Sequence, residues 1–175
     1  MSETNKIVNQ ETGEIINQVA IQEKIVEETD QYVVKQLPSG EFKKEMKYQQ
    51  YFSHVPETQE EQIELYNLFN DEDNDSVIPL SRMVKEEIGI DRVYQRPYQS
   101  FDEKTGVNTN GVTTYIKDGD TYYATSSKTV YHKLREMFQA FGYPNEETYK
   151  KLYVKVTGTK RDNGVQIGLS LSRIG

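Results

Sequence analysis

The sequence has no cysteine and no tryptophan, and only two of its 175 residues are histidine. Without cysteine the chain cannot form a disulfide, a thiolate metal site or a thiol nucleophile, and this composition suits a reducing compartment. The sequence also has no apolar run long enough to span a membrane, and its first residues, MSETNKIVNQ, lack the character of a signal peptide. We therefore expect a soluble protein of the cytoplasm with no membrane partner.

The glycines of a phosphate-binding loop are missing as well. Residues 126–129 read SSKT and end like such a loop, but Ser127 precedes Lys128 where the spacing G-x-x-x-x-G-K-[ST] requires glycine. Without these glycines the backbone amides cannot wrap a phosphate. The hydroxyls of Thr125, Ser126 and Ser127 instead predict the N-terminal cap of a helix.

Metal-binding motifs are equally incomplete. The acidic stretch NDEDND opens like a calcium loop at Asp71, Asp73 and Asp75, but Ser76 replaces its turn glycine and Arg82 stands at the position of its bidentate glutamate. Two histidines without cysteine do not support a zinc site. We expect no metal and no cofactor. Because no nucleophile–base pair is found either, the chain is predicted not to be an enzyme.

Acidic and basic residues are unevenly distributed. The formal net charge is -7, yet residues 1–76 carry 17 Asp and Glu against 6 Lys and Arg, and residues 77–175 carry 11 against 15. Such an asymmetry indicates a nucleic-acid-binding half beside an acidic segment. We therefore divide the chain into an acidic N-terminal extension, residues 1–76, and a nucleic-acid-binding domain, residues 77–175.

The extension is polar and short of core residues, so we expect it to be only partly ordered. Residues 7–8 and 15–16 are apolar pairs on either side of a turn-like Glu-Thr-Gly, which predicts a small hairpin. After Pro56 the stretch ETQEEQIELYNLF has acids at its front and apolar residues further on. This pattern predicts a helix over about residues 57–69. Its apolar residues are Ile63, Leu65, Tyr66 and Phe69.

The second domain is rich in strand-forming residues. We expect about five strands and one helix, with a Gly-containing loop at residues 158–164 between the last two strands. The expected segments are a strand at 88–101, a hairpin at 111–124 turning at Asp118-Gly119-Asp120, a helix at 128–141, and strands at 152–157 and 165–172. Short strands with a helix between them suggest an OB-like β-barrel.

The helix at 128–141 has an amphipathic pattern that ends at Gly142 and Pro144. Apolar residues recur at helical spacing and predict a buried stripe. These residues are Val130, Leu134, Met137, Phe138 and Phe141.

Rings alternate with cations on the predicted strands. Residues two apart share a face of a strand, so Arg92, Tyr94, Arg96 and Tyr98 lie on one side and Val93 on the other. Rings beside cations suit unpaired bases, because bases stack on the rings while the cations contact phosphates, with little dependence on base sequence.

The complete candidate nucleic-acid-binding set contains rings and cations of several strands. It comprises Arg92, Tyr94, Arg96, Tyr98, Tyr115, Lys117, Tyr122, Tyr153, Lys155, Lys160 and Arg161. If the rings at 94 and 98 instead cover the core, the binding surface is expected around the last four residues of this set.

Two stretches carry a family resemblance. The first contains VTTYI, DG, Y, A and SKTV and lies before and at the start of the predicted helix. The second contains ET, VKV, G, G and LSL and lies after that helix. The positions are Val112, Thr113, Thr114, Asp118, Gly119, Tyr122, Ala124, Ser127, Lys128, Thr129, Val130, Glu147, Thr148, Val154, Lys155, Val156, Gly158, Gly164, Leu169, Ser170 and Leu171. Over roughly its last seventy residues the chain resembles the single-stranded DNA-binding proteins of the small Bacillus phages that replicate linear DNA from a terminal protein. The acidic first third and the abundance of Tyr are departures from that family.

The resemblance implies a barrel that coats displaced single strands during replication in a bacterial host cytoplasm, without enzymatic activity. Single-stranded DNA is the expected partner, RNA stays open, and the acidic extension is a candidate contact for a replication protein. Two other classes remain open: an acidic inhibitor that mimics DNA against a host defence enzyme, and a virion structural or assembly protein. A gel shift with single-stranded DNA separates the first class from both others.

Overall fold

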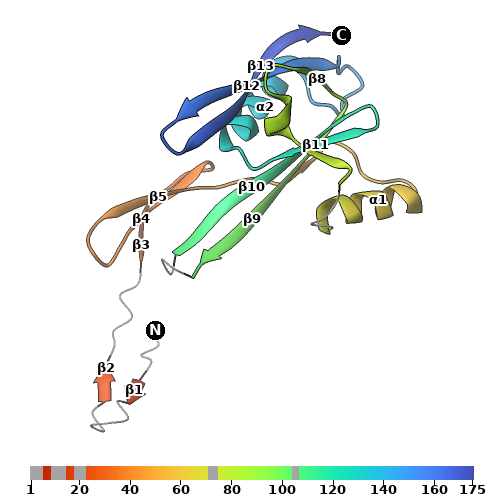
Figure 1. The fold of residues 1–175 in the computed structure, drawn as a ribbon. Helices are drawn as coiled ribbons and strands as arrows, with labels where there is room; N and C mark the ends of the chain where they lie inside the picture. Colours follow the sequence, from red (N-terminus) through yellow and green to blue (C-terminus); the bar gives the residue numbers. More distant parts are fainter. Residues whose placement is uncertain (1–5, 9–14, 18–22, 71–74, 104–106) are drawn as a thin grey trace. The chain divides into compact units, whose positions relative to one another are not determined.

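The computed structural model describes residues 6–8, 15–17, 23–70, 75–103 and 107–175 (Figure 1). The chain forms two compact units that divide between Lys47 and Tyr48. The predicted helix near residues 57–69 therefore belongs to the second unit, and the structural boundary lies well before residue 77. Asp71 and Asp73 of the calcium-like stretch lie outside the described residues.

The first unit consists of two small antiparallel sheets. In one of them Ile7 lies opposite Ile16, as the sequence predicts. The other has the order β3-β4-β5, and Gly40, with a φ of 85°, forms the turn between its last two strands. None of the described side chains in this unit is fully buried. The strands are β1 (Lys6–Val8), β2 (Ile15–Asn17), β3 (Lys24–Glu28), β4 (Tyr32–Gln36) and β5 (Phe42–Met46).

The second unit contains two sheets and two α-helices (Figure 1). One sheet has the order β6-β9-β10-β11-β7 and the other the order β13-β12-β8. The first sheet is formed by β6 (Tyr51–Phe52), β7 (Val77–Pro79), β9 (Arg92–Asp102), β10 (Val107–Asp118) and β11 (Thr121–Thr125). The second is formed by β8 (Glu87–Ile90), β12 (Leu152–Arg161) and β13 (Gly164–Ile174). The helices are α1 (Gln59–Asn70), a short 3-10 helix η1 (Leu80–Met83) and α2 (Lys128–Phe141).

The expected strand at 88–101 is broken at Asp91, where the chain passes from one sheet to the other. β8 pairs with β12, whereas β9 pairs with β10 and β6. At the corner the Asp91 backbone N–H donates to the Lys117 carbonyl at 2.8 Å, and Lys151 Nζ donates to Asp91 at 3.0 Å and to Asp118 at 2.7 Å. A chain that changes sheets at such a corner is typical of packed sheets rather than one closed barrel. The structure is thus mostly β, but the OB-like barrel is not closed.

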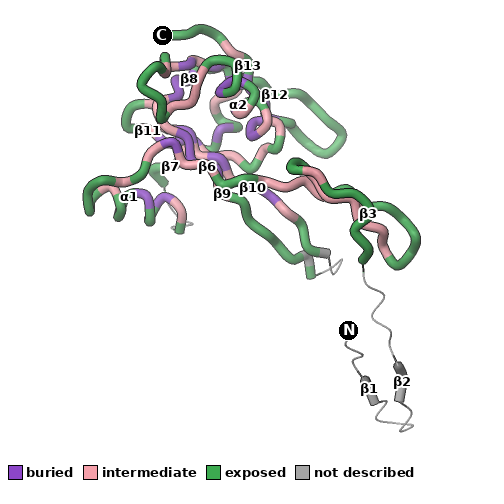
Figure 2. Tube along the Cα trace, turned by 180° about the vertical axis from the view of Figure 1, so that it is seen from behind, coloured by how far each residue is buried: buried purple, intermediate pink, exposed green. Residues whose placement is uncertain are grey.

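The main core lies between the two sheets and α2. Figure 2 shows the buried residues gathered in this region. Alternate residues of a strand face the same side, so Val93 of β9 and Ile116 of β10 lie in this core. Leu152, Val154 and Val156 of β12, which were predicted to face inward, lie there as well.

Helix α2 has the predicted bounds. The Ser127 hydroxyl accepts from the Val130 backbone N–H at 3.4 Å and donates to the Ile167 carbonyl at 2.6 Å, which joins the helix start to β13. Gly142 ends the helix with a φ of 96°, which favours glycine. The apolar stripe is buried as predicted, except for Phe141, which is 44% exposed because it lies in the last turn, beyond the packed part of the stripe.

Helix α1 covers the opposite face of the five-stranded sheet. The Thr58 hydroxyl accepts from the Glu61 backbone N–H at 3.2 Å at its start. Leu65 and Leu68 are buried against Tyr94 and Tyr122. Ile63 and Tyr66, two of the apolar residues of the predicted helix, are exposed. The small core beneath α1 is separate from the main core.

Because the units divide at Lys47, we predict that deletion of residues 1–47 leaves a folded fragment with a single cooperative transition. Deletion of residues 1–76 removes α1 and β6 and should destabilise the remainder strongly, since loss of a buried Leu costs about 2–5 kcal/mol. Urea unfolding of both fragments, followed by circular dichroism, measures the difference. The division at Lys47 would be contradicted if the fragment lacking residues 1–47 fails to fold. It would also be contradicted if the fragment lacking residues 1–76 is as stable as the full chain.

Candidate nucleic-acid interface

Six of the predicted site residues lie together on one face of the five-stranded sheet. We call this the ring-and-cation face; its members are Arg92, Tyr94, Arg96, Tyr115, Lys117 and Tyr122. Strand pairing brings them together, because Tyr94 lies opposite Tyr115 and Lys117 lies between Arg92 and Tyr122. The sequence therefore identified a real cluster, but α1 covers it.

The acidic side of α1 neutralises the cations of this face. Arg92 donates to Glu61 at 3.4 Å, and Lys117 forms an ion pair with Glu64 at 3.2 Å. The backbone N–H of Glu57 and the side chain of His54 also bind Glu61, so its pKa is lowered to about 2, with Arg92 adding to the effect. Glu61 is consequently charged throughout the physiological range.

Phe69, near the end of α1, inserts its ring among the rings of the sheet. The Arg96 guanidinium lies 4.3 Å from the centre of the Phe69 ring, and Arg96 also donates to the Phe69 carbonyl at 3.2 Å. The rings of Tyr115, Phe52 and Tyr94 lie 5.3, 5.4 and 5.9 Å from it, centre to centre. Phe69 thus has aromatic neighbours and a stacked cation, as an unpaired base on a nucleic-acid-binding sheet would.

The expectation that Tyr94 is an exposed ring is wrong. Its side chain is only 2% exposed and that of Tyr122 only 7%, and burial raises the pKa of both hydroxyls. The cause is the amphipathic α1, whose Leu65 and Leu68 need an apolar partner and find it in these two rings.

Tyr98 lies further along β9, beyond this cluster, where residues 97–101 are exposed and Tyr98 is paired with Gly111 of β10. Its ring is 43% exposed and packs over Gly111, where an added Cβ would lie 2.3 Å from the ring. Further along the ladder, Phe101 is exposed as well. Tyr98 is therefore the accessible ring among the predicted residues of β9.

A second group of predicted residues lies on the outward side of the β12–β13 hairpin. We call it the outer β12–β13 face, with Tyr153, Lys155, Thr157 and Arg161 of β12 and Gln166, Ser170 and Arg173 of β13. The Arg173 guanidinium lies 3.4 Å from the centre of the Tyr153 ring. Lys155 is exposed and pairs across the ladder with Ser170. This face offers a flat ring-and-guanidinium pair beside the exposed Lys155, which lies opposite Glu87 of β8.

The end of the hairpin adds further cations. Lys160 and Arg161 are both exposed, and Arg161 donates to Gln166 at 3.0 Å. Glu87 of β8 lies on this face opposite Lys155, and Ser172 and Arg173 bind its carboxylate. The hairpin is longer than expected: both strands continue through the predicted loop at 158–164, and Gly164, with a φ of 126°, follows the turn.

Arg173 was missed by the sequence analysis for a structural reason. In a regular strand, Arg173 would lie on the same side as the inward-facing Leu171, because residues two apart share a side. A β-bulge skips Ser172 in the pairing, so Tyr153 lies opposite Arg173 while Val154 lies opposite Leu171. The bulge moves Arg173 to the outer face, and no sequence signal marks it.

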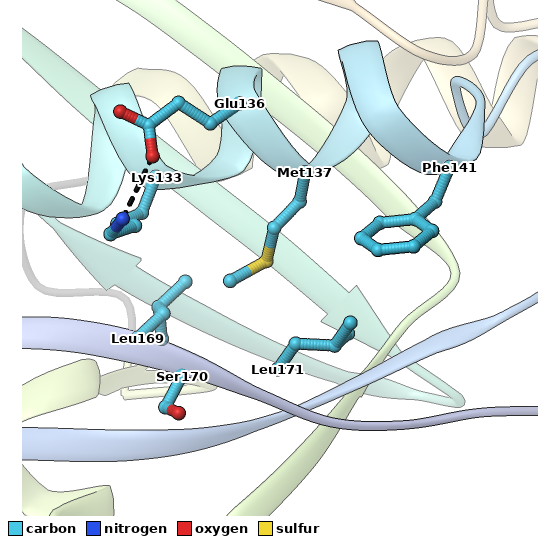
Figure 3. Close-up of a pocket in the computed structure, with 7 residues that line it drawn as sticks. All are labelled: Lys133, Glu136, Met137, Phe141, Leu169, Ser170 and Leu171. Atoms are coloured by element: carbon cyan, nitrogen blue, oxygen red, sulfur yellow. Dashed lines mark hydrogen bonds and ion pairs between the residues drawn. The ribbon is translucent and has the colours of Figure 1, made fainter.

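A groove of about 310 Å³ lies between α2 and β13 (Figure 3). Its apolar lining includes Met137, Phe141 and Leu171, and Lys133 and Glu136 stand at its edge 2.8 Å apart. The carboxylate neutralises the ammonium group, so the groove offers little attraction for a phosphate. We do not include it in the interface.

Within the part of the chain that the structure describes, no group of acidic, histidine or cysteine side chains could hold a metal ion. No described helix is both long and apolar enough to cross a membrane.

Comparison with known proteins finds a clear relative. The chain is 35% identical over 150 residues to the single-stranded DNA-binding protein of Bacillus phage GA-1, covering 84% of this chain and 87% of that protein. No protein-family model and no solved structure matches. A match of this extent cannot lie within residues 77–175 and necessarily includes α1. The expectation that the acidic first third distinguishes this chain from its relatives is therefore wrong for the GA-1 protein.

Tyr94 and Tyr98 give a matched test on one strand. Tyr94→Ala should lower the free energy of unfolding by about 3–5 kcal/mol, because it empties the centre of a packed cluster. Tyr98→Ala should change it by about 0.5 kcal/mol or less, as is usual for an exposed ring. Urea unfolding of both variants measures this. Equal losses would show that the two rings are buried alike.

Proposed function

Because the chain belongs to the family of single-stranded DNA-binding proteins of Bacillus phages, we propose that it binds single-stranded DNA without catalysis and without base-sequence preference. The proposed role is to coat and protect displaced strands during replication of a phage or related element in the bacterial cytoplasm. No metal or cofactor is needed for this activity.

The outer β12–β13 face is the proposed binding surface. The observation that carries this assignment is the Arg173–Tyr153 stack, 3.4 Å from guanidinium to ring centre, beside the exposed Lys155. Each of these groups has a function toward an unpaired strand, because a base can stack on a ring or a guanidinium plane while a cation meets the neighbouring phosphate.

The remainder of the face suits a strand of any sequence. Thr157 and Ser170 are small and exposed, so the backbone of a bound strand can approach the sheet closely. Arg161, on the outer side of β12, extends the positive surface along the strand, and Lys160 adds a cation on the other side of the hairpin end. Tyr98 and Phe101 of β9 are further exposed rings that a longer strand can reach.

The charge of the chain does not oppose this function. Residues 77–175, which include all of this face, carry 15 Lys and Arg against 11 Asp and Glu. The acidic excess is concentrated in residues 48–76, with eight Asp and Glu and no Lys or Arg. A DNA mimic would expose these carboxylates as a pattern, whereas Glu61 and Glu64 are engaged with cations of the sheet.

Selectivity for single strands is the direct test of the function. We expect the protein to bind poly(dT) more tightly than a duplex of equal length, since stacking needs unpaired bases. Fluorescence titration at two salt concentrations measures it, because the emission of this tryptophan-free chain comes from tyrosine. Equal affinity for the two forms at matched salt would exclude the proposal.

The face itself is tested by substitution. Lys155→Gln and Arg161→Gln should each weaken poly(dT) binding and reduce the slope of log affinity against log salt by about 0.7 for each lost phosphate contact. Tyr153→Ala should weaken binding by about 1–3 kcal/mol through lost stacking. Lys133→Gln, on α2 and already paired with Glu136, is the matched control. If the control and the Lys155 variant lose affinity equally, the binding surface lies elsewhere.

A further inference from the structure

Helix α1 occupies a surface whose chemistry is that of a single-strand binding site. The ring-and-cation face combines three tyrosines with three cations on adjacent paired strands. In the structure, its cations and rings are contacted by residues of α1.

The contacts of α1 correspond to those of a nucleotide strand. Carboxylates of Glu61 and Glu64 stand where phosphates would meet Arg92 and Lys117. The ring of Phe69 stands where a base would stack, with the Arg96 guanidinium 4.3 Å from its centre and the Tyr115 ring 5.3 Å away. Along α1, two carboxylates and one aromatic ring therefore occupy the positions in which phosphates and a base would contact the sheet.

The strength of these contacts makes displacement feasible. The Glu61 and Glu64 side chains are 28% and 47% exposed, and such ion pairs are weak and screened by salt. Of the described α1 side chains, only Leu65 and Leu68 are buried. A polyanion that supplies phosphates and several bases can replace all of these contacts at once.

We propose that the ring-and-cation face is a second binding site for single-stranded DNA, which α1 closes in the free protein and which a bound strand opens by displacing the helix. The site goes beyond the outer β12–β13 face and rests on the proposed function only in the identity of the ligand. Its ligand is a single strand long enough to present both phosphates and bases.

Hydrogen exchange on the wild-type protein tests the opening without any substitution. With saturating poly(dT), the backbone amides of residues 59–70 should exchange at least tenfold faster than in the free protein, while those of α2 stay protected. Unchanged or slower exchange in α1 would overturn the proposal.

A thiol probe gives a second reading, because the natural chain has no cysteine. Leu68→Cys places a thiol under α1, and poly(dT) should accelerate its reaction with a maleimide. Ile63→Cys, on the exposed side of the same helix, should react at the same rate with and without DNA. Protection of both thiols by DNA would mean that the strand binds over α1, which contradicts displacement.

Charge variants separate competition from general electrostatics. Glu61→Gln with Glu64→Gln should raise poly(dT) affinity roughly two- to tenfold above Glu57→Gln with Glu60→Gln, which removes the same charge from exposed positions of the same segment. Equal gains in the two double variants would argue against closure by α1.

The two proposals fail in distinguishable ways. If Lys155→Gln weakens binding and α1 exchange is unaffected by DNA, the second site is wrong and the outer β12–β13 face stands. If poly(dT) does not bind at all, both proposals fall.

Discussion

The need to bury both faces of one sheet governs the second unit. A strand sends alternate side chains to opposite sides, and on β9 and β10 both sides carry large side chains that need cover: Val93 and Ile116 on one side, and the rings of Tyr94 and Tyr115 on the other. Such a sheet needs two covers. Helix α2 and the β8–β12–β13 sheet provide one, and α1 provides the other.

The two covers differ in kind. The main core is closed by a tightly packed helix tied at its start to β13 through the Ser127 hydroxyl. The cover on the ring-and-cation face depends on two leucines, one phenylalanine and surface ion pairs. Such a cover is compatible with replacement of α1 by a ligand that also presents negative charges and aromatic rings. Among the described residues, the outer β12–β13 face has no helix packed over it.

Local features were predictable because local chemistry determines them. Ser127 and Gly142 delimit α2 through capping and a positive φ, and Asp118-Gly119-Asp120 turns the β10–β11 hairpin. Alternation placed Leu152, Val154 and Val156 in the core. The side of β12 that carries Tyr153 and Lys155 was predicted for the same reason. Three features lacked a local signal: the change of sheet at Asp91, the bulge at Ser172 and the docking of α1 on Tyr94.

By itself, the sequence determined the mostly β class, the bounds of α2, and the grouping of rings and cations on particular strands, since these depend on residue periodicity and on turn and cap chemistry. Only the tertiary structure decided which of those groups face solvent. Alternation assigns a residue to a side of a strand but does not say what packs against that side. Leu65 and Leu68 lie far from Tyr94 in the chain, and their docking on it turned a predicted open face into a covered one.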